Sequence, residues 1–165
     1  MKSVYDVKFR ALLMEGATMP QGHPPPQEKP KNDDGYFEEM TKAVFRSGFR
    51  WEIVENKWPN FQKAFRNFSV DEVSAFDGRD VERLLEDSGI VRNGRKIEAT
   101  IHNARALKAT QTEFGSFVKF LRTLDDLEYK DRAKAISSRF RYLGRTGTFT
   151  FLWGVAEDVP EWEKR

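Results

Sequence analysis

Residues 89–107 read GIVRNGRKIEATIHNARAL, and this stretch places a charged turn directly in front of a helix. A glycine opens it, and Arg92, Arg95 and Lys96 cluster in the turn. Because LLEDS precedes it and a helical pattern follows over 96–110, the stretch predicts a hairpin of two helices. A helix N-terminus favours an anion, and basic side chains make a phosphate the obvious one. The alternative is that these charges are only solvated on an exposed turn.

A second hairpin is predicted in residues 137–154, which read SSRFRYLGRTGTFTFLWG. Gly144 lets the backbone approach a phosphodiester closely, and Arg139, Arg141 and Arg145 add positive charge. Such contacts would position the protein on a nucleic acid without reading its sequence. The segment TGTFTFLW after the turn fits either a short strand or a buried helix. A glycine-rich turn between ordinary helices is the alternative interpretation.

The rest of the chain predicts a Pro-rich segment followed by a helical body. Residues 16–34 contain five prolines and little to bury, so we expect residues 1–31 to be an N-terminal segment with a linker and 32–165 to be one domain. A helix is expected from the acidic pair at 33–34 to Gly48, and a second from Arg50, interrupted at Pro59. Further helices are capped by Ser69 and by Asp77 or Asp80. The fold class is all-α.

Composition limits the chemistry. The chain has 165 residues, of which 39% are hydrophobic, 33% charged and 13% aromatic. It has no cysteine and only two histidines, which excludes disulfides and thiolate metal sites and predicts neither a metal site nor a cofactor. The net charge is +2 and the pI about 8.8, which permits a nucleic-acid partner if the basic residues share one face. With no signal peptide and no apolar run long enough to cross a bilayer, a cytoplasmic protein is expected.

Four stretches together resemble the 3-methyladenine DNA glycosylase I family, within the helix-hairpin-helix DNA glycosylase superfamily. They are DDGYFEEMTKAVFRSGFRWEIVENKWPNFQKAF, FSVDEVSAFDGRDVERLLEDSGIVRNGRKIEATIHNARA, EFGSF and RFRYLGRTG, and the resemblance covers residues 33–159. The second stretch is the most specific, since the family has a similarly placed LL-x-x-x-GIIRN-x-x-KI-x-A-x-x-x-NA run. The pattern MT-x-x-VF-x-x-GF-x-W of a divergent branch is present from Met40 to Trp51.

The resemblance implies a helical bundle that hydrolyses the N-glycosidic bond of an alkylated base flipped out of double-stranded DNA. It implies a monomer that grips the DNA backbone. The backbone contacts are expected from Arg92, Arg95, Lys96, Arg141, Tyr142, Gly144, Arg145 and Thr146. Trp51, Phe45 and Arg46 are expected at the base, although a tryptophan at a helix junction is as easily a core residue.

The sequence departs from the family at the acid. A family glutamate contacts the flipped base, and counting back from Trp51 places that position at Ala43. The candidates to replace it are Glu38, Glu39 and Asp158, although surface glutamates are common in a first helical turn and such an aspartate is more often a helix cap, so a structural role is favoured for each. The family's zinc site needs cysteines that this chain lacks. Three functions therefore remain: a monofunctional glycosylase, a DNA-binding protein without activity, and an interaction module with no role on DNA.

Overall fold

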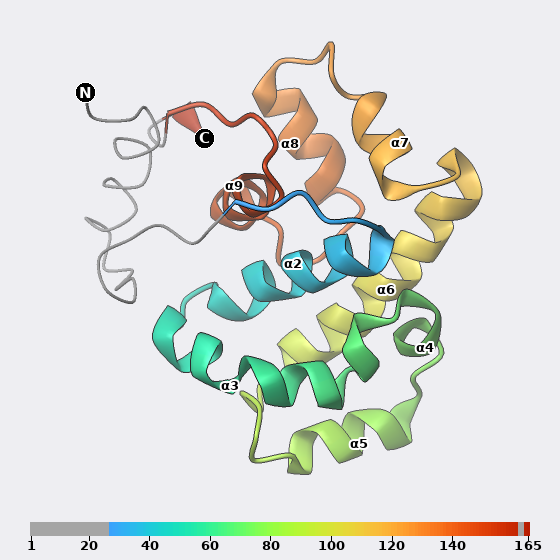
Figure 1. Ribbon diagram of the computed structural model, residues 1–165, viewed down its shortest axis with the longest axis vertical. Helices are drawn as coiled ribbons and strands as arrows, with labels where there is room; N and C mark the ends of the chain where they lie inside the picture. Colours follow the sequence, from blue (N-terminus) through green and yellow to red (C-terminus); the bar gives the residue numbers. More distant parts are fainter. Residues whose placement is uncertain (1–26, 162–163) are drawn as a thin grey trace.

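The computed structural model describes residues 27–161 and 164–165, and within these ranges the chain is helical and has no strand (Figure 1). The all-α prediction is confirmed. The helices, in chain order, are α2 (Asp33–Arg46), α3 (Trp51–Ala64), the short 3-10 helix η2 (Arg66–Phe68), α4 (Val70–Ser74), α5 (Gly78–Glu86), α6 (Gly94–Phe114), α7 (Phe117–Arg122), α8 (Tyr129–Ser137) and α9 (Arg145–Gly154).

Helix α2 crosses the middle of the molecule and packs against both α6 and α9 (Figure 1). It starts at Asn32, whose side chain accepts the Gly35 N–H at 2.9 Å, and it carries two acidic residues in its first turn. The same acids also tie other elements to α2. Asp34 accepts the Val70 N–H at the start of α4, and Asp33 accepts the Phe117 N–H at the start of α7.

Aromatic side chains fill the space between α2, α3 and η2. Trp58 stacks on Phe61 and Phe68, with ring centroids 4.9 and 5.2 Å apart, and Phe65 continues the stack. All but the tryptophan have no exposed surface. Burying rings of this size is the main stabilisation available to a helical domain of this length.

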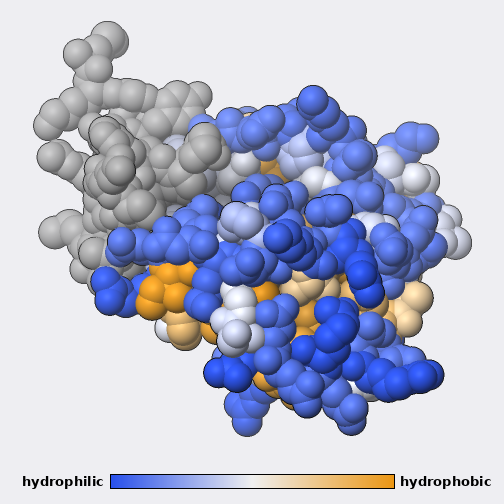
Figure 2. Space-filling model, turned by 60° about the horizontal axis from the view of Figure 1, so that its bottom comes forward, coloured by the Kyte–Doolittle hydropathy of each residue, from blue (hydrophilic) through white to orange (hydrophobic). Residues whose placement is uncertain are grey.

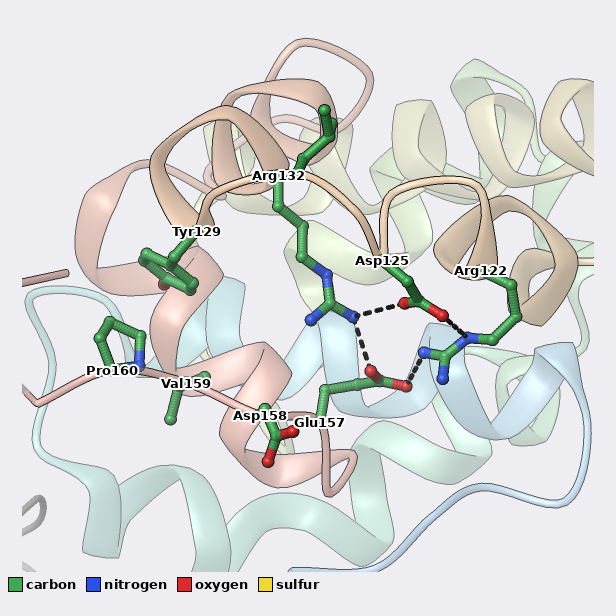
Figure 3. Close-up of a pocket in the computed structure, with 9 residues that line it drawn as sticks. Arg122, Asp125, Tyr129, Arg132, Glu157, Asp158, Val159 and Pro160 are labelled. Carbon is green, nitrogen blue, oxygen red and sulfur yellow. Dashed lines mark hydrogen bonds and ion pairs between the residues drawn. The ribbon is translucent and has the colours of Figure 1, made fainter.

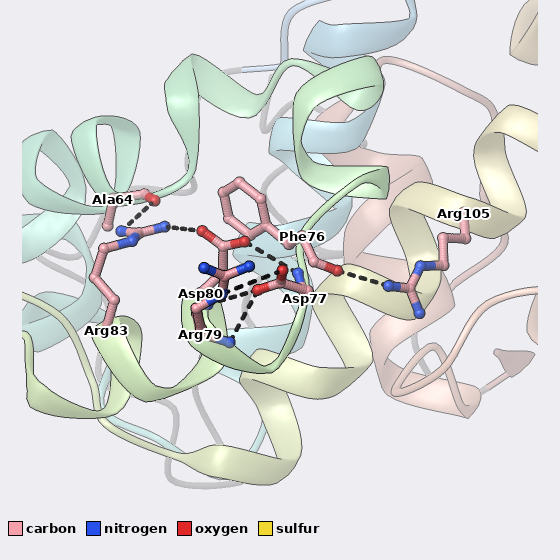
Figure 4. Close-up of polar contacts among 7 residues, drawn as sticks. All are labelled: Ala64, Phe76, Asp77, Arg79, Asp80, Arg83 and Arg105. Atoms are coloured by element: carbon pink, nitrogen blue, oxygen red, sulfur yellow. Dashed lines mark hydrogen bonds and ion pairs between the residues drawn. The ribbon is translucent and has the colours of Figure 1, made fainter.

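Helices α5 and α6 form the first predicted hairpin. Asp77 is the N-cap of α5, and the structure pairs it with Asp80 in a reciprocal capping box, so both candidate caps act together (Figure 4). In the connection from α4 to α5, which precedes this cap, the Phe76 carbonyl accepts a hydrogen bond from Arg105 of α6 at 2.7 Å. Asn93 caps α6 by accepting the Lys96 N–H.

The structure also corrects the expected bounds. Pro59 does not interrupt α3, which continues to Ala64 because the face carrying Trp58 and Phe61 stays buried across the proline. Helix α6 extends beyond the expected 96–110 at both ends. The segment TGTFTFLW is the buried helix α9 and not a strand.

The start of the described chain contacts α9. Gln27 Nε2 donates to the Trp153 carbonyl and the Glu28 N–H to the Gly154 carbonyl, both at 3.1 Å. Residues 27–28 therefore lie on the C-terminal end of α9, while 1–26 of the expected N-terminal segment are outside the described residues. In the described part of the chain, no helix combines the length and hydropathy needed to span a membrane.

Candidate base pocket and DNA-binding hairpins

The second hairpin consists of α8, the turn that follows it and α9. Asn103 of α6 fixes this turn: its Oδ1 accepts the Arg141 N–H at 2.7 Å, and its Nδ2 donates to the Arg141 carbonyl at 3.0 Å. The Asn103 side chain is buried, and both of its bonds to the Arg141 backbone are partly shielded from water. The hairpin is thus held on α6 by one amide, that of Asn103, to which the sequence pattern assigned no role although it belongs to the NA pair of the family-like run.

A close backbone approach shapes the same turn. Tyr142 has a positive φ of 59°, and a side chain added at Gly147 would place its Cβ 2.6 Å from the Tyr142 carbonyl oxygen. Thr148 Oγ1 donates to the Leu143 carbonyl at 2.7 Å. Glycine at 147 is therefore required for α9 to begin directly under the turn.

The predicted backbone-contact residues of this hairpin lie on its outside. The exposed set is Arg141, Tyr142, Gly144, Arg145 and Thr146. Gly144 is the N-cap of α9 and has no side chain to cap it. Arg165 borders this surface, since Arg145 Nε donates to its carbonyl oxygen at 2.8 Å.

The first hairpin presents only part of its predicted charge. Arg92 and Arg95 are exposed, whereas Lys96 is 5% exposed. Its Nζ donates to the carbonyls of Phe45 and Ser47, at 3.2 and 2.5 Å, and burial lowers the pKa of the ammonium. Lys96 thus satisfies the C-terminal end of α2 and does not face a phosphate, which corrects its assignment to the DNA backbone.

A shallow hollow lies between the two hairpins. Its polar lining consists of the basic residues His102, Arg105 and Arg141 and the acidic residues Asp77 and Glu98. Burial and the charges of Arg141 and Arg105 lower the pKa of His102. The face in Figure 2 is mostly hydrophilic, with small hydrophobic areas between the polar side chains. The exposed large hydrophobic residues of the described chain include Phe49, Leu85, Leu127 and Tyr142.

The residues expected at the base lie at the junction of α2 and α3. Trp51 begins α3, and the guanidinium carbon of Arg46, the last residue of α2, lies 4.9 Å from the centroid of its ring. Arg46 also pairs with the carboxylate of Glu55, one helical turn after Trp51. Both rings are buried, but differently: Trp51 is 5% exposed and lies beneath the Arg46 guanidinium, whereas Phe45 is fully buried, 4.7 Å from the ring of Phe61. Phe45 therefore supports the core and cannot contact a base directly.

Two of the three candidate acids have structural partners on α2 or α3. Glu38 accepts hydrogen bonds from Trp58 Nε1 and Gln62 Nε2, at 2.8 and 2.9 Å. Glu39 pairs with Lys42 at 2.8 Å. The carboxylate that pairs with Arg46, beside the Trp51 ring, belongs to Glu55, which was not among the candidates from the sequence. Its position four residues after a candidate base-binding tryptophan was the available signal.

Asp158 is exposed and lines a cavity of about 440 Å³ near the end of α9, where it points away from the neighbouring arginines (Figure 3). Glu157 fills the polar centre instead, accepting from Arg122 at 2.5 Å and from Arg132 at 2.6 Å. Burial would raise the pKa of Glu157, but the hydrogen bonds and charges of both arginines outweigh it, and the pKa is lowered. Tyr129 borders this cavity, and burial raises its pKa to about 12.

No group of three or more acidic or histidine side chains in the described chain is arranged to hold a metal ion.

Comparison with known proteins identifies this architecture. The chain is 31% identical over 135 residues to DNA-3-methyladenine glycosylase 1 of Escherichia coli (strain K12), covering 70% of this chain and 72% of that protein. It is 24% identical over 143 residues to DNA-3-methyladenine glycosylase of Haemophilus influenzae, covering 74% and 77%.

Solved structures agree with this fold. A crystal structure of 3-methyladenine DNA glycosylase I superimposes with a TM-score of 0.69 at 28% identity, over 78% of this chain and 81% of that one. The sequence profile of the family described as methyladenine glycosylase matches residues 27–148, a range that includes Trp51 and both hairpin turns. The chain therefore belongs to the methyladenine glycosylase family.

Proposed function

We propose that this protein is a monofunctional DNA N-glycosylase that hydrolyses the N-glycosidic bond of an alkylated base, 3-methyladenine, flipped out of double-stranded DNA. The observation that carries the proposal is the second hairpin. Its exposed turn is fixed on α6 by Asn103 and carries the exposed Arg141 and Arg145 beside the start of α9. The curated relatives with this architecture are named DNA-3-methyladenine glycosylases.

The chemistry asks little of a general acid. A base alkylated on a ring nitrogen already carries positive charge, so it is a good leaving group, and binding it in an aromatic site with a nearby carboxylate favours its departure. Trp51 provides the ring. The usual glutamate is absent at Ala43, which leaves the carboxylate to another residue. No Schiff base is proposed, because Lys134, the nearest lysine, precedes the hairpin turn.

The second candidate function is a DNA-binding protein that keeps the scaffold without releasing a base. Two observations favour it: Ala43 at the position of the family glutamate, and an Arg46 side chain that covers the ring of Trp51. Both candidates predict DNA binding that weakens with salt, whereas a solvated interaction module would not bind DNA in this way.

The test is incubation of the purified protein with DNA treated with a methylating agent, followed by chromatography of the released bases. Release of 3-methyladenine above a control without enzyme supports the glycosylase. DNA binding without release of any methylated base supports the second candidate. Trp51→Ala should abolish release and leave DNA affinity nearly unchanged; an equal loss of both would make Trp51 a structural residue only.

A further inference from the structure

The Arg46 side chain covers the ring of Trp51, the candidate base-binding residue. Its guanidinium lies 4.9 Å from the centroid of the Trp51 ring and is paired with Glu55. The Arg46 side chain is only 10% exposed, and its Nε is buried with no hydrogen-bond partner, while the Glu55 side chain remains 39% exposed. The guanidinium is therefore held by an aromatic ring and one carboxylate that solvent still reaches.

A guanidinium and an alkylated purine share their chemistry. Both are flat, delocalised cations whose N–H groups donate to a carboxylate and whose plane stacks on an indole ring. A site made of Trp51 and Glu55 satisfies these requirements for either one. The same pair gives a neutral base no comparable attraction, since binding it would leave Glu55 without a cation.

We propose that Trp51 and Glu55 form the recognition site for the positively charged base and that Arg46 occupies this site until a flipped base displaces it. The proposal rests on the glycosylase function proposed above. Glu55 then supplies the carboxylate that Ala43 lacks. The exchange conserves charge: the carboxylate loses one cation and gains another.

The position of Arg46 suits this exchange. Arg46 is the last residue of α2, and Gly48, with a φ of +67°, follows it in the connection to α3. An alternative rotamer of this side chain at the helix end requires no change in the α2 backbone. Glu38 and Glu39 are less suited to receive a base, since the first already accepts two hydrogen bonds and the second pairs with Lys42.

The experiment is a titration of the full ¹⁵N-labelled chain by NMR with two probes. The first, 3,9-dimethyladeninium, is a cation whose 9-methyl group stands for the sugar, and the second, 9-methyladenine, is its neutral counterpart. In the wild type, the cation should shift the Trp51 indole N–H and move the Arg46 Nε–H to the position of an exposed arginine. The neutral probe should do neither at the same concentration.

Variants separate the roles of the two charged residues. Arg46→Met should bind the cationic probe at least tenfold more tightly than the wild type, because the competing guanidinium is gone. Glu55→Gln should bind it at least tenfold more weakly. The matched control is Glu52→Gln on the same helix. The Glu52 carboxylate is exposed and pairs only with Arg50, at 3.8 Å, so this substitution should not change binding of the probe. Thermal unfolding of each variant reports whether it is folded.

Unchanged binding by Glu55→Gln, weaker binding by Arg46→Met, or an Arg46 Nε–H signal that does not move in the wild type would each overturn the proposal. Failure of the glycosylase function looks different: no variant releases a methylated base from DNA, although the cationic probe still shifts the Trp51 signal. Normal base release by Glu55→Gln would leave the glycosylase intact and remove Glu55 from it.

Discussion

Asn103 shows how one buried side chain fixes a turn far from it in sequence. Its amide bonds both backbone groups of Arg141, 38 positions later, and so decides where the second hairpin sits on α6. A buried hydrogen bond adds little net free energy to folding, whereas a buried polar group without a partner costs considerably more. The Asn103 amide therefore acts mainly by excluding other positions of the turn.

Asn103→Ala should lower the free energy of unfolding by about 2 kcal/mol, because it leaves the Arg141 N–H and carbonyl without partners. DNA affinity should fall in parallel, since the turn loses its anchor. Chemical denaturation and a DNA-binding titration check both effects. Asn60→Ala is the control: its exposed amide makes a single bond to the first hairpin, at Gly89, and its loss should be small.

Gly147→Ala should be destabilising by about 2 kcal/mol, because the new methyl group would overlap the Tyr142 carbonyl oxygen and push the turn away from α9. Gly78→Ala is the matched control, since a Cβ there meets nothing within 4 Å and alanine favours a helix. Equal thermal midpoints for the two variants would show that the turn tolerates the extra atom.

At the scale of elements, the hairpins are predicted to bind DNA as paired turns carried by one long helix. The start of α6 carries Arg95, and Asn103, eight residues further along the helix, holds the second turn, so the two lie roughly 12 Å apart along the helix axis. A rigid helix between them keeps this spacing constant.

Arg145→Glu should weaken binding to all DNA sequences alike and reduce the slope of log K against log salt by about one, the value for one phosphate contact. The measurement is fluorescence anisotropy of labelled duplexes over a range of salt. Arg79→Glu makes the same change of net charge on α5, outside the second hairpin, where the exposed side chain pairs with Asp77, and it should leave the slope nearly unchanged. Identical slopes for both variants would remove the second hairpin from the DNA surface.

Patterns of neighbouring residues predicted the helices well, but they predicted few of the contacts between helices. The caps at Ser69 and Asp77 are confirmed, because a cap depends on residues two or three positions away. Pro59 was misjudged, since the packing of α3 outweighs the hydrogen bond that a proline removes. Lys96 was placed on the DNA surface because its partners, the carbonyls at the end of α2, are about fifty positions away and leave no local trace.

At the scale of the whole molecule, Glu157 ties the segment after α9 to α7 and α8. Its side chain is 11% exposed and bridges Arg122 and Arg132 (Figure 3). An ion pair with this little contact with water is costly to break from one side, because the remaining charge stays desolvated.

Glu157→Gln should lower the free energy of unfolding by roughly 3 kcal/mol at neutral pH. The carboxyl has a lowered pKa in the folded state, so its contribution is complete above its ordinary pKa, about 4.5, and is lost as the pH falls through the folded value. Urea unfolding of both proteins should therefore differ most at neutral pH and converge in acid. A difference that is the same at every pH would mean that the carboxylate charge has no part in it.

The contact of the first described residues with α9 has a consequence for how the protein is made. Gln27 and Trp153 are 126 positions apart, and α2, which follows Gln27, rests on the same helix. During synthesis, the part of α2 that packs on α9 stays uncovered until α9 has left the ribosome, although α3 and α6 can cover the rest of the helix earlier, so this contact forms last. A nascent chain halted before α9 would expose that part of α2 and become a substrate for chaperones.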